Sequence, residues 1–242
     1  MRVEDPSPAA LYEYADAYLE LDGWEGQREG RRALLRILDR EPTYGDAFDR
    51  WAALYPDRDE MAEVARELSD RVGGAEAVNV LAPRAADLWI QLGEPSEAAR
   101  VLDLWRRAAV TASPAWHYWR ARILFVEGRE SEATAAFAEG LAAAASAASA
   151  ADLAPYRRDL EPLLGPDDLA ALAALDERAQ AGAIRAFWET RDLTPFSPAN
   201  ERLAEHYRRL AEVRRRYLWK KPLAKEKTIG PFIDDLGRPS FD

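Results

Sequence analysis

The sequence lacks cysteine altogether, and its 242 residues include two histidines and two methionines. A chain without cysteine forms no disulfide, holds no metal through thiolates and has no cysteine nucleophile. No segment approaches the run of about 18 to 20 apolar residues that a membrane-spanning helix requires. Residues 1–30 do not combine a basic start with an apolar core, so no signal peptide is visible. These absences do not identify the compartment of the protein.

Motifs of common catalytic sites are also missing. The sequence has no glycine-rich phosphate loop, no Gly-x-Ser-x-Gly turn and no paired catalytic carboxylates. The acidic pairs at 167–168 and 234–235 are adjacent residues that share no helix face, and a helix start and a turn explain them. His117 and His206 do not follow the spacing of a helical zinc site. We therefore expect no catalytic residue, no cofactor and no metal site.

The net charge of −10 is unevenly distributed along the chain. Residues 201–227 contain ten Arg and Lys against four Glu, whereas residues 1–200 carry a net charge of −14. An acidic body repels nucleic acid and acidic membrane surfaces, so we expect no nucleic-acid partner. Two interpretations of the basic segment stay open. In the first, the segment contacts a polyanion. In the second, it has no such partner and either docks on the acidic body of the chain or forms a solvated helix.

Apolar residues recur every three or four positions through most of the chain, as in helices with one buried face. Glycine and proline separate these segments, and Ser7 before Pro8 is a typical helix start. The Ala- and Ser-rich residues 140–151 are interpreted as the end of a long helix, because alanine is the best helix former. Further helices are expected over residues 8–20, from the Gly23-Trp24 break to about residue 40, and over about residues 47–55, 61–73, 76–92, 95–107, 152–164, 166–178 and 179–189. A last long helix is expected to start at Ser197-Pro198.

One segment of the sequence repeats at an offset of 35 residues. Leu88-Trp89, Gly93, Ser96-Glu97-Ala98 and Leu102 correspond to Ile123-Leu124, Gly128, Ser131-Glu132-Ala133 and Phe137. A glycine between two helices, followed by a small residue at their crossing, suits a tightly packed helix pair that stacks on the next. The pattern resembles the tetratricopeptide repeat family over about residues 8–141, with the Gly93 and Gly128 units as the best matches. We expect an all-α, right-handed α-solenoid of helix hairpins, with a final long helix and an extended C-terminal tail.

The densest aromatic cluster of the sequence is a candidate binding surface. In helical repeats such aromatic residues usually belong to the core, and those left over line the concave face and anchor a peptide. Both interpretations stay open for the four residues Trp105, Trp116, Tyr118 and Trp119.

The stretch from Phe187 to Tyr217 carries the most specific pattern of the chain. A tryptophan precedes Arg-Asp-x-Thr-Pro, a short loop, Asn-Glu and Glu-His-Tyr-Arg-Arg, and this order resembles the entry to the bacterial GWxTD domain. The matching residues are Trp188, Arg191, Asp192, Thr194, Pro195, Asn200, Glu201, Glu205, His206, Tyr207, Arg208 and Arg209.

The resemblance to the GWxTD domain implies a particular organisation of the chain. Members of that family often pair N-terminal helical repeats with the domain, usually in exported bacterial proteins, and their biochemical role is not established. The Gly-Trp-x-Thr-Asp element itself is absent here, since residues 221–225 read Lys-Pro-Leu-Ala-Lys. We expect repeats over residues 1–182 and an incomplete GWxTD-like domain over 183–242, which is either truncated or divergent.

The leading functional hypothesis is a non-enzymatic scaffold that binds a protein or peptide on the concave face of its repeats. The first alternative is a regulatory or partial enzyme, with a site around Asp192 and His206 that also involves Arg191, Glu205 and Arg208. The second is polyanion binding by residues 214–227. For His206 itself, we expect a carboxylate partner that orients the last helix against the loop of Asp192. The resemblance implies an exported protein, and otherwise a cytoplasmic one is expected.

Overall fold

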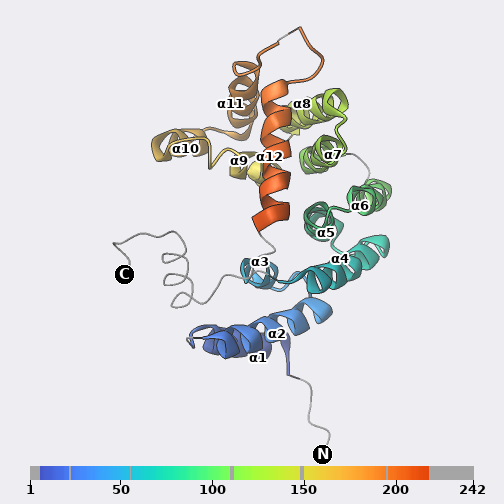
Figure 1. Cartoon of the computed structure of the whole chain (residues 1–242), viewed down its shortest axis with the longest axis vertical. Coiled ribbons are helices and arrows are strands. Elements are labelled where there is room, and N and C mark those ends of the chain that lie inside the picture. Colours follow the sequence, from blue (N-terminus) through green and yellow to red (C-terminus); the bar gives the residue numbers. More distant parts are fainter. Residues whose placement is uncertain are drawn as a thin grey trace, which may run out of the picture. The chain divides into compact units, whose positions relative to one another are not determined.

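The fold is all-α throughout the described part of the chain, which consists of residues 6–21, 23–54, 56–109, 112–147, 150–194 and 196–217 of a computed structural model. Within these residues the chain forms helices and no strand (Figure 1). The helices are α1 (Pro8–Leu19), α2 (Trp24–Arg40), α3 (Ala47–Ala53), α4 (Arg58–Gly73), α5 (Val78–Leu92), α6 (Pro95–Ala108), α7 (Pro114–Val126), α8 (Glu130–Ala147), α9 (Ala150–Arg158), α10 (Pro166–Ala173), α11 (Glu177–Glu189) and α12 (Glu201–Tyr217).

The chain divides into two compact units, which are described separately. Unit 1 contains residues 1–67 and 216–242, and unit 2 contains residues 68–215. None of the described helices is both long enough and apolar enough to span a membrane. The predicted C-terminal tail lies outside the described residues.

Unit 1 is built on the hairpin of α1 and α2. The predicted cap at Ser7 is confirmed, because its hydroxyl accepts a hydrogen bond of 3.2 Å from the backbone N–H of Ala10. The buried face of α2 includes Leu34 and Ile37, both at 0% exposure. Trp51 of α3 is equally buried and donates its indole N–H to the Glu60 carboxylate over 3.1 Å. Apolar burial therefore holds these helices together, while the polar group of the tryptophan keeps a partner.

Unit 2 begins with two hairpins that follow the 35-residue repeat of the sequence. Gly93 and Gly128 end α5 and α7 with left-handed φ values of 77° and 75°, a conformation that glycine adopts without steric cost. The backbone hydrogen bonds around the two glycines also correspond, because Glu94 N–H donates to the carbonyl of Trp89 and Arg129 N–H to that of Leu124. The repeat seen in the sequence is thus a repeat of the structure.

Two predicted helices of unit 2 end earlier than expected. The helix predicted over 152–164 stops at Arg158, where Asp159 turns inward and becomes 5% exposed. The helix predicted over 166–178 stops at Ala173, and Asp176 then caps α11 by accepting a 2.8 Å hydrogen bond from the N–H of Ala179. Buried polar contacts and local side-chain caps outweighed helix propensity in both places.

The last two boundaries also differ in detail from the expectation. The long helix that was predicted to run to residue 151 ends as α8 at Ala147, and α9 starts at Ala150. The final helix begins at Glu201 and is capped by Asn200, whose side-chain oxygen accepts a 2.9 Å hydrogen bond from the N–H of Leu203. Ser197 was the predicted cap, and its hydroxyl instead accepts from the N–H of Ala199 in the preceding loop.

Gly140 lies at a close approach inside unit 2, where α8 meets Tyr156 of α9 and His117 of α7. A Cβ atom at Gly140 would overlap the hydroxyl of Tyr156 and lie 2.9 Å from the Cβ of His117. Gly182 in α11 has no such neighbour within 4 Å. Alanine favours a helix over glycine by about 1 kcal/mol, but overpacking a core costs about 1–3 kcal/mol.

We expect Gly140→Ala to lower the free energy of unfolding by about 1–2 kcal/mol, since overpacking outweighs helix propensity there. Gly182→Ala is the matched control and is expected to raise it by up to about 1 kcal/mol. Urea denaturation followed by circular dichroism measures both. An unchanged or raised stability for Gly140→Ala would show that α7, α8 and α9 do not pack this closely.

Candidate functional site

The centre of unit 2 contains a buried charge, Arg122 of α7, which is 3% exposed. Its guanidinium donates to the hydroxyl of Tyr118 over 3.3 Å and to the carboxylate of Asp87 in α5 over 3.4 Å. The Tyr118 hydroxyl in turn donates to the carboxylate of Asp159, just after α9, over 2.5 Å. A buried charge is costly unless it is paired and hydrogen-bonded, and this set of residues, the Arg122 cluster, supplies both kinds of partner.

Aromatic rings enclose the Arg122 cluster. The guanidinium carbon lies 5.1 Å from the ring centroid of Trp119 and 5.9 Å from that of Tyr207 in α12. Tyr207 stacks on Phe125 at a centroid distance of 4.9 Å and an interplanar angle of 15°. Such contacts between a cation and ring faces add to the ion pairing in a site that excludes water. The cluster thereby joins α5, α7, α9 and α12.

Burial and neighbouring charged groups together set the protonation states of the Arg122 cluster. It lowers the pKa of Arg122, but the neighbouring Tyr118, Asp87 and Asp159 outweigh that effect and leave the pKa above its ordinary value. Burial also raises the pKa of the Tyr118 and Tyr207 hydroxyls. Arginine therefore stays charged and both tyrosines stay neutral, which suits hydrogen bonding and not proton transfer.

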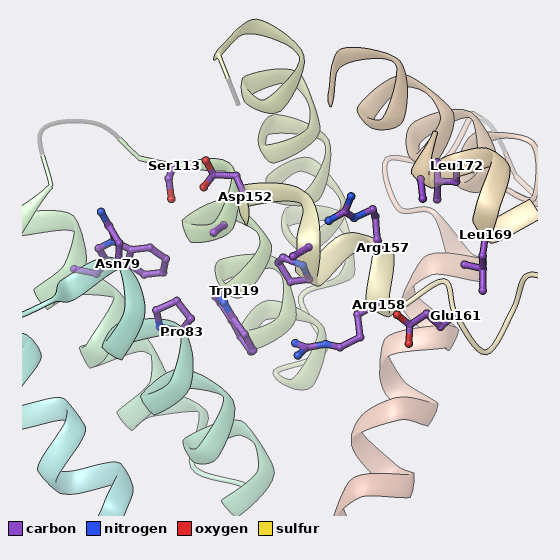
Figure 2. A pocket seen from close by; sticks show the side chains of 15 residues that line it. Asn79, Pro83, Ser113, Trp119, Asp152, Arg157, Arg158, Glu161, Leu169 and Leu172 are labelled. Carbon is purple, nitrogen blue, oxygen red and sulfur yellow. The ribbon is translucent and has the colours of Figure 1, made fainter. Parts of the chain in front are cut away.

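An open groove lies beside the Arg122 cluster, between α5 and α7 on one side and α9 and α10 on the other (Figure 2). Its volume is about 1080 Å³. Trp119 lines the groove, and Leu169 and Leu172 of α10 face it from the opposite side. Arg157 and Arg158 extend into it from α9. The groove therefore combines aromatic and aliphatic walls with charged side chains.

The four candidate aromatic residues lie in different surroundings. Trp105, Tyr118 and Trp119 are 2%, 0% and 3% exposed, so they belong to the core, and Trp116 is half-buried. Trp105 and Trp119 nevertheless line the groove, whereas Tyr118 lies within the Arg122 cluster. Among these four residues, a peptide could contact only the half-buried Trp116 and those parts of Trp105 and Trp119 that line the groove.

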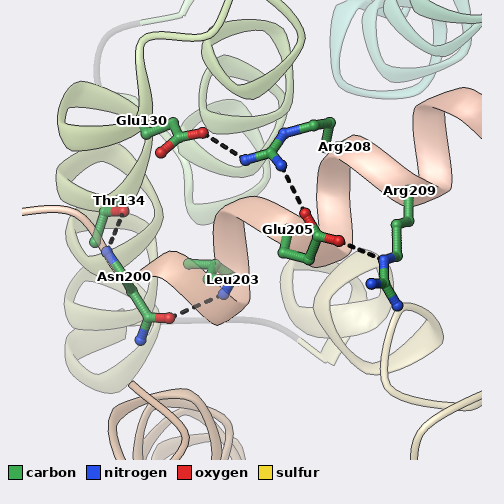
Figure 3. Close-up of polar contacts among 7 residues, drawn as sticks. All are labelled: Glu130, Thr134, Asn200, Leu203, Glu205, Arg208 and Arg209. Carbon is green, nitrogen blue, oxygen red and sulfur yellow. Dashed lines mark hydrogen bonds and ion pairs between the residues drawn. The ribbon is translucent and has the colours of Figure 1, made fainter. Parts of the chain in front are cut away.

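Asn200 connects three elements of the junction between α11 and α12. Its side-chain N–H donates to the carbonyl of Trp188, at the end of α11, over 2.8 Å. Its backbone N–H donates to the hydroxyl of Thr134 in α8 over 3.1 Å (Figure 3). Together with the cap on Leu203, these contacts engage both side-chain polar atoms and the backbone N–H of a residue that is 7% exposed.

The charged residues that follow Asn200 form a chain of ion pairs. Glu205 accepts hydrogen bonds from Arg208 over 2.6 Å and from Arg209 over 2.5 Å (Figure 3). Arg208 also reaches Glu130 of α8 over 2.7 Å. Glu201 is exposed in the first turn of α12. On an exposed surface such pairs contribute little to stability.

The loop before α12 satisfies its own polar groups. Arg191 stacks on the ring of Phe187 at 3.7 Å and donates to the Phe187 carbonyl over 3.1 Å. Asp192 accepts a 3.2 Å hydrogen bond from the backbone N–H of Thr194. Pro195 lies outside the described residues. Asp192 thus forms a local turn, and it is not among the residues that line the cavity beside His206.

His206 packs differently from the expectation. Its ring centroid lies 5.2 Å from that of Trp188 and 5.2 Å from that of Tyr207. Its Nε2 atom is buried and has no hydrogen-bond partner among the described residues. No hydrogen bond between His206 and a carboxylate is seen among the described residues, and its ring packs against Trp188 and Tyr207. Burial lowers the pKa of His206, while Asp159 opposes this effect and Arg122 adds to it.

The sequence patterns did not identify the Arg122 cluster, although two signals for it exist. Arg122 stands in the apolar stretch of α7, where a charge requires an explanation. Asp87 and Arg122 are also separated by 35 residues, so they occupy equivalent positions of the two matching repeats and carry opposite charges. Asp159 and Tyr207 come from outside the repeat and leave no comparable pattern.

No protein-family model, curated protein or solved structure matches this chain. The likeness to tetratricopeptide repeats and to the GWxTD domain therefore rests on the sequence motifs alone.

Breaking the Arg122 cluster is expected to destabilise unit 2 strongly. Arg122→Met removes the cation beside the buried Asp159 and the partly exposed Asp87, which should lower the free energy of unfolding by about 3 kcal/mol or more. Arg120→Met, on the exposed side of the same helix, is the control and should cost less than about 1 kcal/mol. Urea denaturation compares the two, and equal effects would contradict a central role for Arg122.

The buried histidine gives a pH dependence of defined sign. Since the pKa of His206 lies below its ordinary value of 6.5 in the folded state, its contribution to stability is complete above pH 6.5 and is lost as the pH falls through the folded pKa. His206→Phe retains the ring packing and should flatten the fall in melting temperature between about pH 7 and about pH 5.5. A pH profile identical to that of the unmodified protein would contradict this role. Burial also lowers the pKa of His117. The pH profile of a His117→Phe variant can therefore be compared with that of His206→Phe.

Proposed function

We propose that this chain is a non-enzymatic scaffold that binds a peptide segment of a partner protein in the groove between α5, α7, α9 and α10. The observation that carries the proposal is the groove itself, with a volume of about 1080 Å³ beside the aromatic cluster. Small-molecule sites measure roughly 300–1,000 Å³ and enclose their ligand, so an open groove of this size suits a chain segment better.

The lining of the groove supports recognition of a peptide with apolar side chains and an acidic group. Leu169 and Leu172 offer aliphatic contacts, and Trp119 adds a rigid aromatic edge. Arg158 has no carboxylate partner among the described residues and can pair with an acidic side chain of the ligand at the groove. Asn79 uses its side-chain oxygen to accept from Trp105 over 2.9 Å, which leaves its amide N–H groups for a peptide carbonyl.

The proposed architecture is a right-handed α-solenoid of tetratricopeptide-like hairpins, whose concave face includes the groove. The equal 35-residue spacing of the Gly93 and Gly128 hairpins supports this arrangement. In this proposal the repeats extend over residues 1–182, and residues 183–242 represent part of a GWxTD-like domain. The resemblance of the segment from Trp188 to Arg209 supports the second assignment.

The rival enzymatic site receives less support. Asp192, Glu205 and Arg208 are engaged with backbone groups or with one another, and a general acid or base needs access to substrate. The polyanion hypothesis concerns residues 214–227, whose side chains lie outside the described part of the chain.

A groove-filling substitution tests the proposed function. Peptides are selected from a random peptide library displayed on phage, and their affinity is then measured for two variants. Ala154→Trp places a large ring in the groove, whereas Ala135→Trp places the same ring on an exposed position of α8 outside it. We expect the first variant to weaken binding at least tenfold and the second to leave it unchanged.

The selected sequences provide a second readout of the proposed function. Enrichment of peptides with apolar residues and an Asp or Glu is expected from the lining of the groove. Failure to select any peptide, or peptides that bind Ala154→Trp as well as the unmodified protein, would contradict the proposal.

A further inference from the structure

A second and smaller cavity lies between α11, α12 and the turn that follows α9, and it shares no lining residue with the groove. Its volume is about 430 Å³, within the range of sites for small organic molecules. All its lining residues belong to unit 2. The junction segment that carries the GWxTD resemblance thus forms one wall of a cavity.

The charge of this cavity is positive, although the whole protein carries −10. Three arginines line it, Arg191, Arg202 and Arg209, against the single carboxylate of Glu205. That carboxylate already accepts hydrogen bonds from Arg208 and Arg209. Within the described residues, Arg191 and Arg202 have no carboxylate partner. Two guanidinium groups are therefore available to an anion from outside.

The geometry of Arg191 suits a carboxylate in particular. Its guanidinium carbon lies over the Phe187 ring, 3.7 Å from the ring centroid, and the group is fixed further by the hydrogen bond to the Phe187 carbonyl. A planar guanidinium held in this way keeps an edge with parallel N–H groups, which match the two oxygens of a carboxylate. Holding the group in place before binding reduces the entropy that binding costs.

Apart from His206, the other lining residues of the cavity are apolar. Phe187, Trp188 and Leu210 contribute ring and aliphatic surface, and Val213 remains 51% exposed at its edge. Exposed apolar side chains that gather at a cavity are typical of a binding surface, whereas single exposed apolar residues occur on any protein surface. A fully hydrated anion such as inorganic phosphate would gain nothing from these walls.

We infer that this cavity binds a small monocarboxylate with an aromatic or aliphatic body, whose carboxylate is held by Arg191 and Arg202. The apolar body of the ligand lies against Phe187 and Leu210. This site is separate from the proposed peptide groove and does not depend on it.

Isothermal titration calorimetry with 4-phenylbutyrate tests the inference, with 4-phenylbutan-1-ol and inorganic phosphate as comparison ligands. We expect 4-phenylbutyrate to bind at least tenfold more tightly than either comparison ligand, because only it offers both the carboxylate and the apolar body. The double variant Arg191→Gln/Arg202→Gln should lose this binding at least tenfold. Both side chains are exposed, so circular dichroism should confirm an intact fold.

The control variant is Arg185→Gln, which removes an exposed arginine of α11 that pairs with Glu189 and does not line the cavity. It should bind 4-phenylbutyrate as the unmodified protein does. The groove variant Ala154→Trp should also retain this binding, which separates the two sites. No measurable binding of 4-phenylbutyrate, equal binding of the alcohol or of phosphate, or unchanged affinity in the double variant would overturn the inference.

Discussion

The arrangement of unit 2 depends on how the charge of Arg122 is accommodated inside an apolar core. The desolvation of a buried guanidinium costs several kcal/mol, and the attraction of its partners offsets this only when the geometry is good. Here the partners come from distant parts of the chain: Asp87 from α5, Asp159 from the end of α9 and the ring of Tyr207 from α12. The four helices must therefore keep their positions together.

The accommodation of this charge also explains the position of the groove. Since Asp159 turns inward to Tyr118, α9 ends at Arg158, and the last turn of that helix places Arg157 and Arg158 at the groove. Trp119 takes part in both features, with Arg122 over its ring and part of its surface at the groove. A contact that stabilises the core thereby shapes the surface on which we propose that a peptide binds.

The sequence predicts the local structure well where a signal is local. The glycines at positions 93 and 128 mark helix ends, and the cap at Ser7 follows from its place before Pro8. Prediction from the sequence fails where a contact between distant residues decides where a helix begins or ends. The early end of α9 depends on Tyr118, 41 residues away, and the cap at Asn200 is fixed by contacts with α8 and α11.

The candidate site shows the same division. Aromatic density left core packing and peptide anchoring open for Trp105, Trp116, Tyr118 and Trp119, and three of these residues belong to the core, of which Trp105 and Trp119 also line the groove. Three residues of the alternative enzymatic site, Arg191, Glu205 and His206, line the small cavity. Its apolar walls were not predicted, because they come together only when α11 and α12 fold against the turn after α9. The motif residues of the junction were recognisable as a group, whereas their roles as cap, ion pair or ring contact depend on partners in other helices.

The central claim is that the Arg122 cluster makes α12 part of the same cooperative body as the repeat hairpins. Native-state hydrogen exchange at increasing denaturant concentration tests it most directly, because it gives the opening free energy of individual amides. The account predicts that the amides of Tyr118 in α7 and Tyr207 in α12 exchange through one shared opening. Exchange of Tyr207 through a separate opening that costs several kcal/mol less would contradict it.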